Sequence, residues 1–235
     1  LKNMKNKLDY IIKKIQHIDK IQILELGVRH GFSTKKFIEL CDSNDGFLIS
    51  VDIKDCSDVI KSDRWKFIHS SDDNFEEVDK FITKDLDFIL IDSLHEPNHV
   101  EKVFYHYYNF LKKGGICIID DISWLPYSKN QKRDKEFSEH INRSTFKKIL
   151  EIFNQNQKNF DLEFYFRDSG YAIITKNEEN TVNINKGDNV FRDRKYFGPV
   201  NIERMSIRLL DKYGEVIDLQ GSNFSFELEF TLKYS

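Results

Sequence analysis

The apolar residues of this chain follow two kinds of pattern. Short, nearly continuous apolar runs predict strands that are buried on both faces. Five such runs stand at Ile23–Leu26, Phe47–Asp52, Trp65–Ile68, Leu86–Asp92 and Gly115–Asp121. Further on, Leu162–Phe166 and Tyr171–Thr175 flank a polar turn and predict an antiparallel hairpin. Between the strands, apolar residues at three- and four-residue spacings predict helices, so the pattern indicates an α/β fold.

Three segments have a clear helical spacing. After a Ser-Thr pair that can cap the first turn, apolar residues continue to Leu40. A second helix follows Pro97, and we expect it to stop at Lys112–Gly115, where basic residues precede two glycines. The third is the N-terminal segment, residues 1–19, with isoleucines on a helical period among lysines. Such a helix can lie on a membrane surface, but we expect it to pack across the sheet edge or over a bound cofactor.

Composition and charge narrow the classes of function. The 235 residues are 40% hydrophobic and 32% charged, as in an ordinary soluble domain. The net charge of −3 gives no electrostatic support for a broad nucleic-acid surface. The three cysteines lack metal-site spacing, and we expect them to be reduced. No apolar run has the length of a membrane span and no signal peptide precedes the first domain, so we expect a cytoplasmic protein without a membrane partner.

Two glycines, Gly27 and Gly31, follow the first apolar run and precede a helix. A backbone that turns this sharply can approach a ligand closely. The spacing differs from the three-glycine dinucleotide fingerprint, which disfavours a nicotinamide-dependent oxidoreductase, and it lacks the Gly-Lys-Ser/Thr of a phosphate-binding loop. With Glu25 before the first glycine and Ser33 after the second, the segment resembles motif I of the class I S-adenosylmethionine-dependent methyltransferases.

That resemblance covers residues 20–176 and implies both a fold and a cofactor site. The implied fold is a Rossmann-like, doubly wound sheet of seven strands in the order 3-2-1-4-5-7-6. The implied cofactor residues are Glu25, Gly27, Gly31, Ser33, Asp52, Ser71, Asp72 and Asp92. Asp52, at the end of the second strand, would accept hydrogen bonds from the ribose diol. Ser71 and Asp72 would face the adenine, whereas we expect Asp73 to cap the next helix.

Two strands of the expected sheet end in carboxylates, one in Asp92 and the other in Asp120 and Asp121. Parallel neighbours deliver their last residues to the same edge, so three carboxylates would converge and require a compensating cation or proton. Oxygen ligands favour Mg²⁺, with Ca²⁺ or Mn²⁺ as alternatives, over zinc. The set is similar to the metal site of catechol-type and related small-molecule O-methyltransferases. The alternative is that Asp120 and Asp121 only cap and solubilise a strand end.

His95 stands three residues after Asp92, and this Asp-x-x-His pattern is similar to a subfamily of bacterial methyltransferases that act on sugars and secondary metabolites. It makes His95 a candidate general base, since imidazole can accept a proton near neutral pH. The alternative is a histidine that hydrogen-bonds the backbone at a helix start. We expect His99 to be structural or to face the substrate. Trp124 and Tyr127 are placed to wall an acceptor pocket, or else lie on the surface.

The character of the chain changes after Lys176. Residues 177–188 are polar with little periodicity and predict a linker. Residues 189–235 contain alternating runs and predict a small C-terminal β appendage. Within it, Arg204–Phe230 resembles C-terminal segments of virion proteins of large DNA viruses. That resemblance implies an assembly partner, or a second copy of this chain, bound through residues 189–235.

The sequence therefore predicts an N-terminal helix (1–19), a methyltransferase domain (20–176), a linker (177–188) and a β-rich appendage (189–235). The predicted function is transfer of a methyl group from S-adenosylmethionine to a hydroxyl of a small molecule or sugar, assisted by a divalent cation. The alternative is a methyltransferase-like assembly or virion-associated protein that docks through its C-terminal segment, with or without catalysis.

Overall fold

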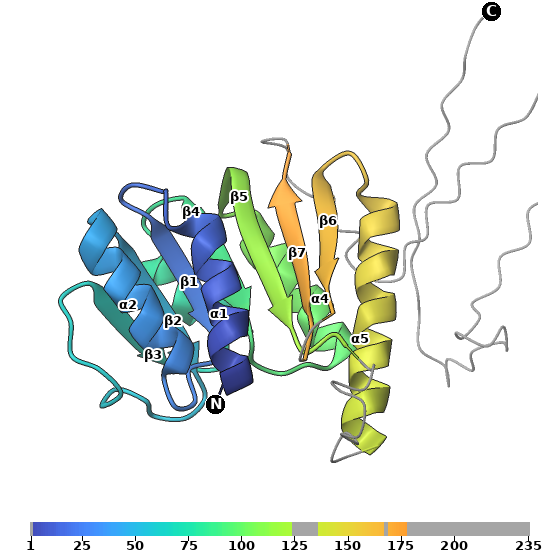
Figure 1. Cartoon of the computed structure of the whole chain (residues 1–235), viewed down its shortest axis with the longest axis horizontal. Helices are drawn as coiled ribbons and strands as arrows, with labels where there is room; N and C mark the ends of the chain where they lie inside the picture. Colours follow the sequence, from blue (N-terminus) through green and yellow to red (C-terminus); the bar gives the residue numbers. More distant parts are fainter. Residues whose placement is uncertain (1, 124–135, 167–168, 178–235) are drawn as a thin grey trace, which may run out of the picture. The chain divides into compact units, whose positions relative to one another are not determined.

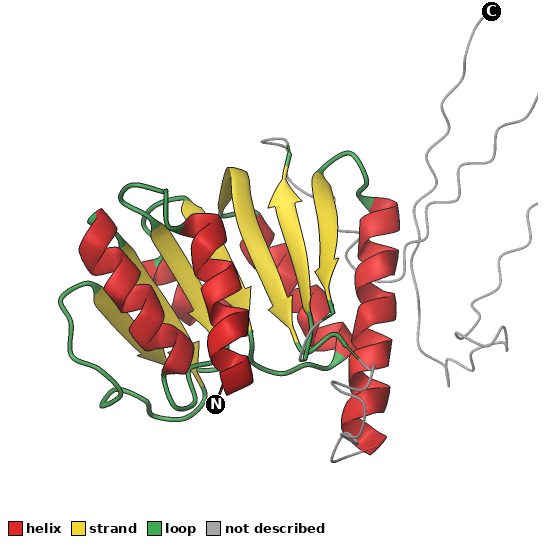
Figure 2. Cartoon of the chain, viewed as in Figure 1, coloured by secondary structure: helices red, strands yellow, loops and turns green. Residues whose placement is uncertain are grey.

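A seven-stranded sheet forms the centre of the fold (Figures 1 and 2). The computed structural model of the chain describes residues 2–123, 136–166 and 169–177. The strands are β1 (Gln22–Leu26), β2 (Phe47–Asp52), β3 (Trp65–His69), β4 (Leu86–Ile91), β5 (Leu111–Asp120), β6 (Phe160–Tyr165) and β7 (Tyr171–Lys176). Their order is β3-β2-β1-β4-β5-β7-β6, and β7 runs antiparallel to both of its neighbours while the other pairs are parallel. The predicted Rossmann-like, doubly wound sheet is confirmed.

Helices cover both faces of this sheet (Figure 2). They are α1 (Lys2–Ile15), α2 (Phe32–Asn44), α3 (Phe75–Val78), the short 3₁₀ helix η1 (Asp79–Phe81), α4 (Pro97–Tyr108) and α5 (Glu136–Gln155). The apolar residues of α1 and α2 share one core cluster, and those of α3, α4 and α5 share the other. The layers are therefore helix, sheet and helix, as a doubly wound fold requires.

Neighbouring residues of a central strand point into the two cores alternately. In β1, Ile23 packs with the α1 and α2 side chains and Leu24 with those of α4, and neither is exposed to solvent. Phe88 and Ile89 of β4 divide in the same way. Each large apolar side chain buried like this stabilises the fold by about 1.5–3 kcal/mol. The carboxyl-terminal edge of the sheet thus rests on a well-packed scaffold.

The amphipathic N-terminal helix packs on the sheet, as expected. Ile11 and Ile15 of α1 are fully buried, and Tyr10 stacks on Tyr165 of β6 with ring centroids 4.7 Å apart. The apolar stripe that would face a membrane surface is therefore covered by the protein's own core. None of the described helices is long and apolar enough to cross a membrane.

The boundary between α4 and β5 differs from the prediction. The helix ends at Tyr108, and Lys112–Gly115 lies inside β5 instead of at a helix terminus. Leu111 already pairs with Leu86 of β4, and the register then shifts so that Phe88 pairs with Ile116. This irregularity takes up the extra residues, so basic and glycine residues occur within a strand. The predicted linker beyond Asn177 and the appendage at 189–235 lie outside the described residues and stay predictions.

Candidate active site at the carboxyl-terminal edge of the sheet

The loop between β1 and α2 packs directly on the end of β4. Gly27 has φ of 101°, and a Cβ on it would lie 2.2 Å from the backbone oxygen of Asp92. The Asp92 N–H also donates to the Leu26 carbonyl over 2.8 Å. Gly31, with φ of 69°, begins α2, and a Cβ there would lie 1.9 Å from Cγ1 of Val59. Both positions therefore favour glycine. The contact at Gly27 joins the glycine loop to residues 92–96, the segment after β4 that contains Asp92 and His95.

Glu25 lies beneath this loop and is fully buried. Its carboxyl group accepts hydrogen bonds from the hydroxyls of Ser33 (2.5 Å), Thr34 (2.8 Å) and Ser50 (2.7 Å). Burial raises the pKa of Glu25 to about 7, although these hydroxyl donors act in the opposite direction. Glu25 and Ser33, both predicted to touch the cofactor, thus contact each other. They fasten the first turn of α2 to β1 and β2 from inside.

Asp52 ends β2 and faces the same loop. Its Oδ2 accepts the backbone N–H groups of Val28 (2.8 Å) and Arg29 (2.9 Å), and its Oδ1 accepts that of Lys54 (2.8 Å). Burial acts to raise the pKa of Asp52, but the three backbone donors outweigh it and hold the pKa below its ordinary value. The residue is half-buried, so part of it is in contact with solvent.

The two residues expected to face an adenine are already engaged with neighbours. The Ser71 hydroxyl donates to Asp73 over 2.6 Å, and Asp72 is buried with bonds from Ser93 and His99. The prediction that Asp73 caps a helix is wrong. Asn74 occupies that position, and Asp73 binds Ser71 and the Lys102 ammonium, 3.0 Å away. Local sequence rules miss this arrangement because Lys102 lies on α4, far along the chain from Asp73.

His95 lies between two of the three candidate carboxylates. Its Nε2 is 3.6 Å from Oδ1 of Asp92 and 3.5 Å from Oδ2 of Asp121. The Thr145 hydroxyl of α5 holds the His95 backbone carbonyl at 2.5 Å. Asp121 has φ of 56°, a left-handed conformation that aspartate tolerates better than most residues. Thr145 is fifty positions away from His95, and nothing in its local sequence indicates this role.

Asp120 comes to the same edge but is directed differently. Its Oδ1 accepts the Asp121 backbone N–H at 2.5 Å and the hydroxyl of Ser169, in the β6–β7 connection, at 3.1 Å. Buried Tyr171 interacts electrostatically with all three carboxylates. Its pKa is raised first by burial and then by the charges of Asp120, Asp92 and Asp121. Across the described part of the chain, no three histidine, cysteine, aspartate or glutamate side chains form a metal-binding group.

Three large apolar side chains next in sequence to Gly31, Asp52 and His95 are exposed to solvent, and the sequence pattern did not predict this. Phe32 follows Gly31, Ile53 follows Asp52, and Leu94 precedes His95, with exposed fractions of 51%, 69% and 49%. Exposed apolar side chains gathered near polar candidates provide surface that a ligand can cover. The expected pocket residues Trp124 and Tyr127 lie outside the described residues.

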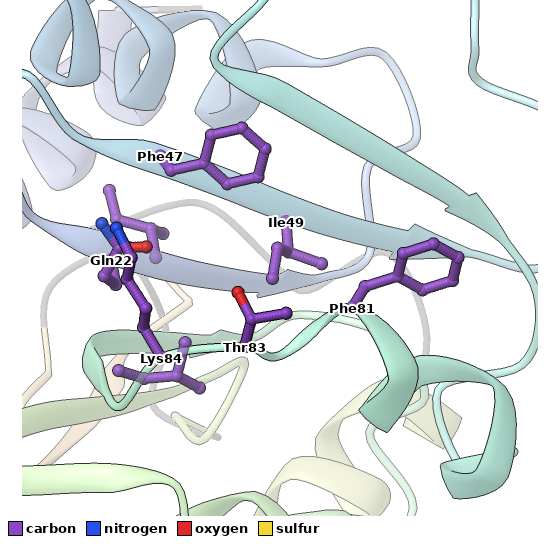
Figure 3. Close-up of a pocket in the computed structure, with 8 residues that line it drawn as sticks. Gln22, Phe47, Ile49, Phe81, Thr83 and Lys84 are labelled. Atoms are coloured by element: carbon purple, nitrogen blue, oxygen red, sulfur yellow. The ribbon is translucent and has the colours of Figure 1, made fainter.

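A small pocket of about 30 Å³ lies at the opposite end of the strands. It is lined by residues near the starts of β1, β2 and β4, among them Gln22, Phe47 and Leu86, together with Phe81, Thr83 and Lys84 (Figure 3). Its size suits one or two water molecules, and it contains no candidate site residue. The candidate chemistry belongs to the carboxyl-terminal edge, where α/β sheets bind ligands.

Sheet order and site location together define the class I S-adenosylmethionine-dependent methyltransferase fold. Within that class, residues 24–122 match the Methyltransf_24 family, described as a methyltransferase domain. This match covers the glycine loop, Asp52, the β4 segment and the end of β5. A search of curated proteins found no significant match.

Solved structures of methyltransferases share the fold at low sequence identity. A "putative caffeoyl-CoA O-methyltransferase" from Staphylococcus aureus is 19% identical over 72% of this chain and 82% of its own, with a TM-score of 0.57. A Podospora anserina methyltransferase bound to S-adenosylhomocysteine (SAH) is 16% identical over 73% and 78%, with a TM-score of 0.59. MycE, a mycinamycin-pathway methyltransferase bound to Mg and SAH, is 18% identical with a TM-score of 0.54; the match covers 77% of this chain and 50% of MycE.

Proposed function

We propose that this protein transfers a methyl group from S-adenosylmethionine to a hydroxyl oxygen of a small molecule or sugar. The observation that carries the proposal is the position of His95 between Asp92 and Asp121, 3.6 and 3.5 Å from their carboxylates. This group adjoins the glycine loop through the contact between Gly27 and Asp92. A proton acceptor is thus joined to a nucleoside-binding loop at one edge of the sheet.

In this proposal the cofactor lies over the glycine loop. The turn from Gly27 to Gly31, which these glycines allow to pack against Asp92 and Val59, supports it, and Asp52 receives the ribose hydroxyls. Exposed Ile53 and Leu94 offer apolar contact to the face of the adenine ring. Glu25 acts from beneath, holding the loop instead of touching the cofactor. When bound, S-adenosylmethionine supplies an electrophilic methyl group.

His95 acts as the general base. Its imidazole takes the proton of the acceptor hydroxyl, so that the oxygen becomes a stronger nucleophile. Without a bound cation, the carboxylates of Asp92 and Asp121 stabilise the positive charge that forms on the ring. The Thr145 hydroxyl holds the His95 backbone and so limits the movement of the base. Positioning and deprotonation are the tasks that a methyl transfer leaves to the protein.

The proposed divalent cation fits Asp92 and Asp121. Mg²⁺ takes oxygen ligands and is commonly held by one or two protein carboxylates, with waters completing the shell. These two aspartates supply that chemistry, while the Asp120 carboxylate is directed to Ser169 and the Asp121 backbone. When bound, the cation would lower the pKa of the acceptor hydroxyl. Mg²⁺ is our choice, with Mn²⁺ or Ca²⁺ as alternatives.

Calorimetric titration of S-adenosylmethionine and SAH into the purified chain, with and without Mg²⁺, tests the cofactor. We expect micromolar binding, and Asp52→Ala should abolish it. Asp55→Ala is the matched control, since the Asp55 side chain is exposed and its carboxylate accepts the backbone N–H of nearby Ser57. Absence of binding to folded wild-type protein would reject the proposal.

Transfer itself is measured with methyl-labelled S-adenosylmethionine and a panel of catechols and sugars. We expect His95→Gln to lower turnover at least a hundredfold, because loss of a general base typically costs this much. Its affinity for SAH should stay within about threefold of wild type. An unchanged rate in His95→Gln with an accepted substrate would remove His95 as the base.

A further inference from the structure

Asp72, which is buried, and Ser93 and His99, which are partly buried, form a hydrogen-bonded cluster that takes no direct part in the proposed transfer. The side chains of Asp72 and His99 are only 7% and 13% exposed. Oδ2 of Asp72 accepts the Ser93 hydroxyl at 2.5 Å, and His99 Nε2 lies 3.0 Å from Oδ1 and 3.2 Å from Oδ2. Both oxygens of one buried carboxylate are therefore committed to neighbouring side chains.

The cluster links the segment around Asp72 to a segment more than twenty residues further along the chain. Asp72 belongs to the β3–α3 connection, Ser93 to the β4–α4 connection and His99 to the first turns of α4. Tyr107, further along α4, donates its hydroxyl to the Asp72 backbone oxygen at 2.6 Å. Because α4 packs in the core through Val100, Val103 and Phe104, all of them buried, it is a rigid support for Asp72.

The charges around the cluster favour its formation. The hydrogen bond with Asp72 raises the pKa of His99, burial opposes this, and the charges of Asp72 and Asp73 add to the increase. Lys102 acts in the opposite direction. A protonated His99 makes a charge-assisted bond to Asp72, and such bonds are stronger than neutral ones.

Ser93 connects the cluster to the candidate catalytic loop, residues 92–96, through its hydrogen bond to Asp72. Asp92 immediately precedes Ser93, and His95 comes two residues later. The other fixed points of the loop are the Asp92 N–H, bound to Leu26, and the His95 carbonyl, bound to Thr145. The Asp72–Ser93 bond lies between these two points.

We propose that Asp72 and His99 are positioning residues, which hold residues 92–96 through Ser93 so that Asp92 and His95 face Asp121. The role in catalysis rests on the proposed function, whereas the structural restraint does not. This assignment replaces the expected contact of Asp72 with an adenine, because its carboxylate is buried and bound within the protein.

Backbone ¹⁵N relaxation of the full chain tests the restraint directly. We expect order parameters near about 0.85 for Leu94 to Glu96 in the wild type, falling below about 0.6 in His99→Leu. His99→Gln, whose amide can still donate to Asp72, should restore them. Asp73→Asn is the matched control, because this neighbouring carboxylate binds Ser71 and the more exposed Lys102 and should leave the loop rigid.

Ser93→Ala provides an independent arm if His99→Leu fails to fold. It removes only the bond between the cluster and the loop, so the same loss of order is expected with little change in overall stability. The proposal would be overturned if the order parameters of Leu94 to Glu96 stayed at the wild-type level in whichever of His99→Leu and Ser93→Ala folds. Failure of the proposed function has a different signature: wild-type protein without SAH binding, whatever the order parameters.

Discussion

The backbone oxygen of Asp92 lies 2.2 Å from the point where a Cβ on Gly27 would stand. The two residues directly follow the neighbouring parallel strands β1 and β4, and their close packing joins the proposed cofactor loop to the proposed catalytic loop. A side chain on Gly27 therefore disturbs both halves of the site at once.

Gly27→Ala tests this coupling. We expect loss of about 2 kcal/mol or more in unfolding free energy, because φ of 101° strains alanine and its Cβ meets backbone atoms. SAH affinity should fall at least tenfold. Gly114→Ala is the matched control: it also has positive φ, 76°, but open space around the added Cβ. Denaturant unfolding and calorimetry of both variants measure the effects, and equal losses of stability and affinity would contradict the steric argument.

Buried Glu25 should make stability depend on pH. Its pKa is raised from 4.5 to about 7 in the folded state, so folding favours the protonated form. The stability associated with this group is fully present below about pH 4.5 and is lost as pH rises through about 7. Each pKa unit corresponds to about 1.4 kcal/mol, so the rise from 4.5 to about 7 corresponds to a loss of about 3 kcal/mol.

Glu25→Gln isolates this effect from the other titrating groups. As the pH rises from 5 to 8, the unfolding free energy of the variant should increase relative to that of the wild type. Glutamine stays uncharged over this range, whereas buried Glu25 loses its proton. Urea unfolding of both proteins across this range gives the difference in unfolding free energy. A difference that is constant with pH would show that Glu25 does not titrate in this window.

The three aspartates should differ in their effect on a bound cation. Asp92→Asn and Asp121→Asn should each weaken Mn²⁺ binding at least tenfold, because these carboxylates flank His95. Asp120→Asn should have a smaller effect, since its carboxylate binds Ser169 and the Asp121 backbone. Paramagnetic resonance of free Mn²⁺ measures the affinities. Equal losses would make Asp120 a ligand as well, and no binding by wild type would reject the metal proposal.

The strands and the sheet were predictable because their signal is local. In β4, the four consecutive residues Phe88–Ile91 are apolar, which few structures other than a doubly covered strand accommodate. Strand order came from the resemblance carried by the glycine loop and not from the runs themselves. The β5 start was missed because pairing with β4, a long-range interaction, extends the strand through Lys112–Gly115.

Candidate site positions were predictable, but their contacts were not. The ends of parallel strands necessarily meet at one edge, so Asp92 and Asp121 could be grouped from the sequence. The hydrogen-bond partners of these residues come from far along the chain, such as Thr145 for the His95 carbonyl and Ser50 for the Glu25 carboxyl group. Packing of α2, α4 and α5 decides these partners, and no local pattern encodes them.

Substitution of the exposed residue Ile53 separates an effect on SAH binding from an effect on protein stability. Ile53 is 69% exposed directly after Asp52, so Ile53→Ala should change unfolding free energy by less than about 0.5 kcal/mol. If the nucleoside covers this side chain, the same change should weaken SAH binding several-fold through lost apolar contact. Leu150→Ala on α5, 40% exposed in the free protein and distant in sequence from the candidate residues, is the control for a generic loss of apolar surface. SAH affinity that falls for Ile53→Ala alone would support a nucleoside site over the end of β2, and equal affinities in both variants would place the ligand elsewhere.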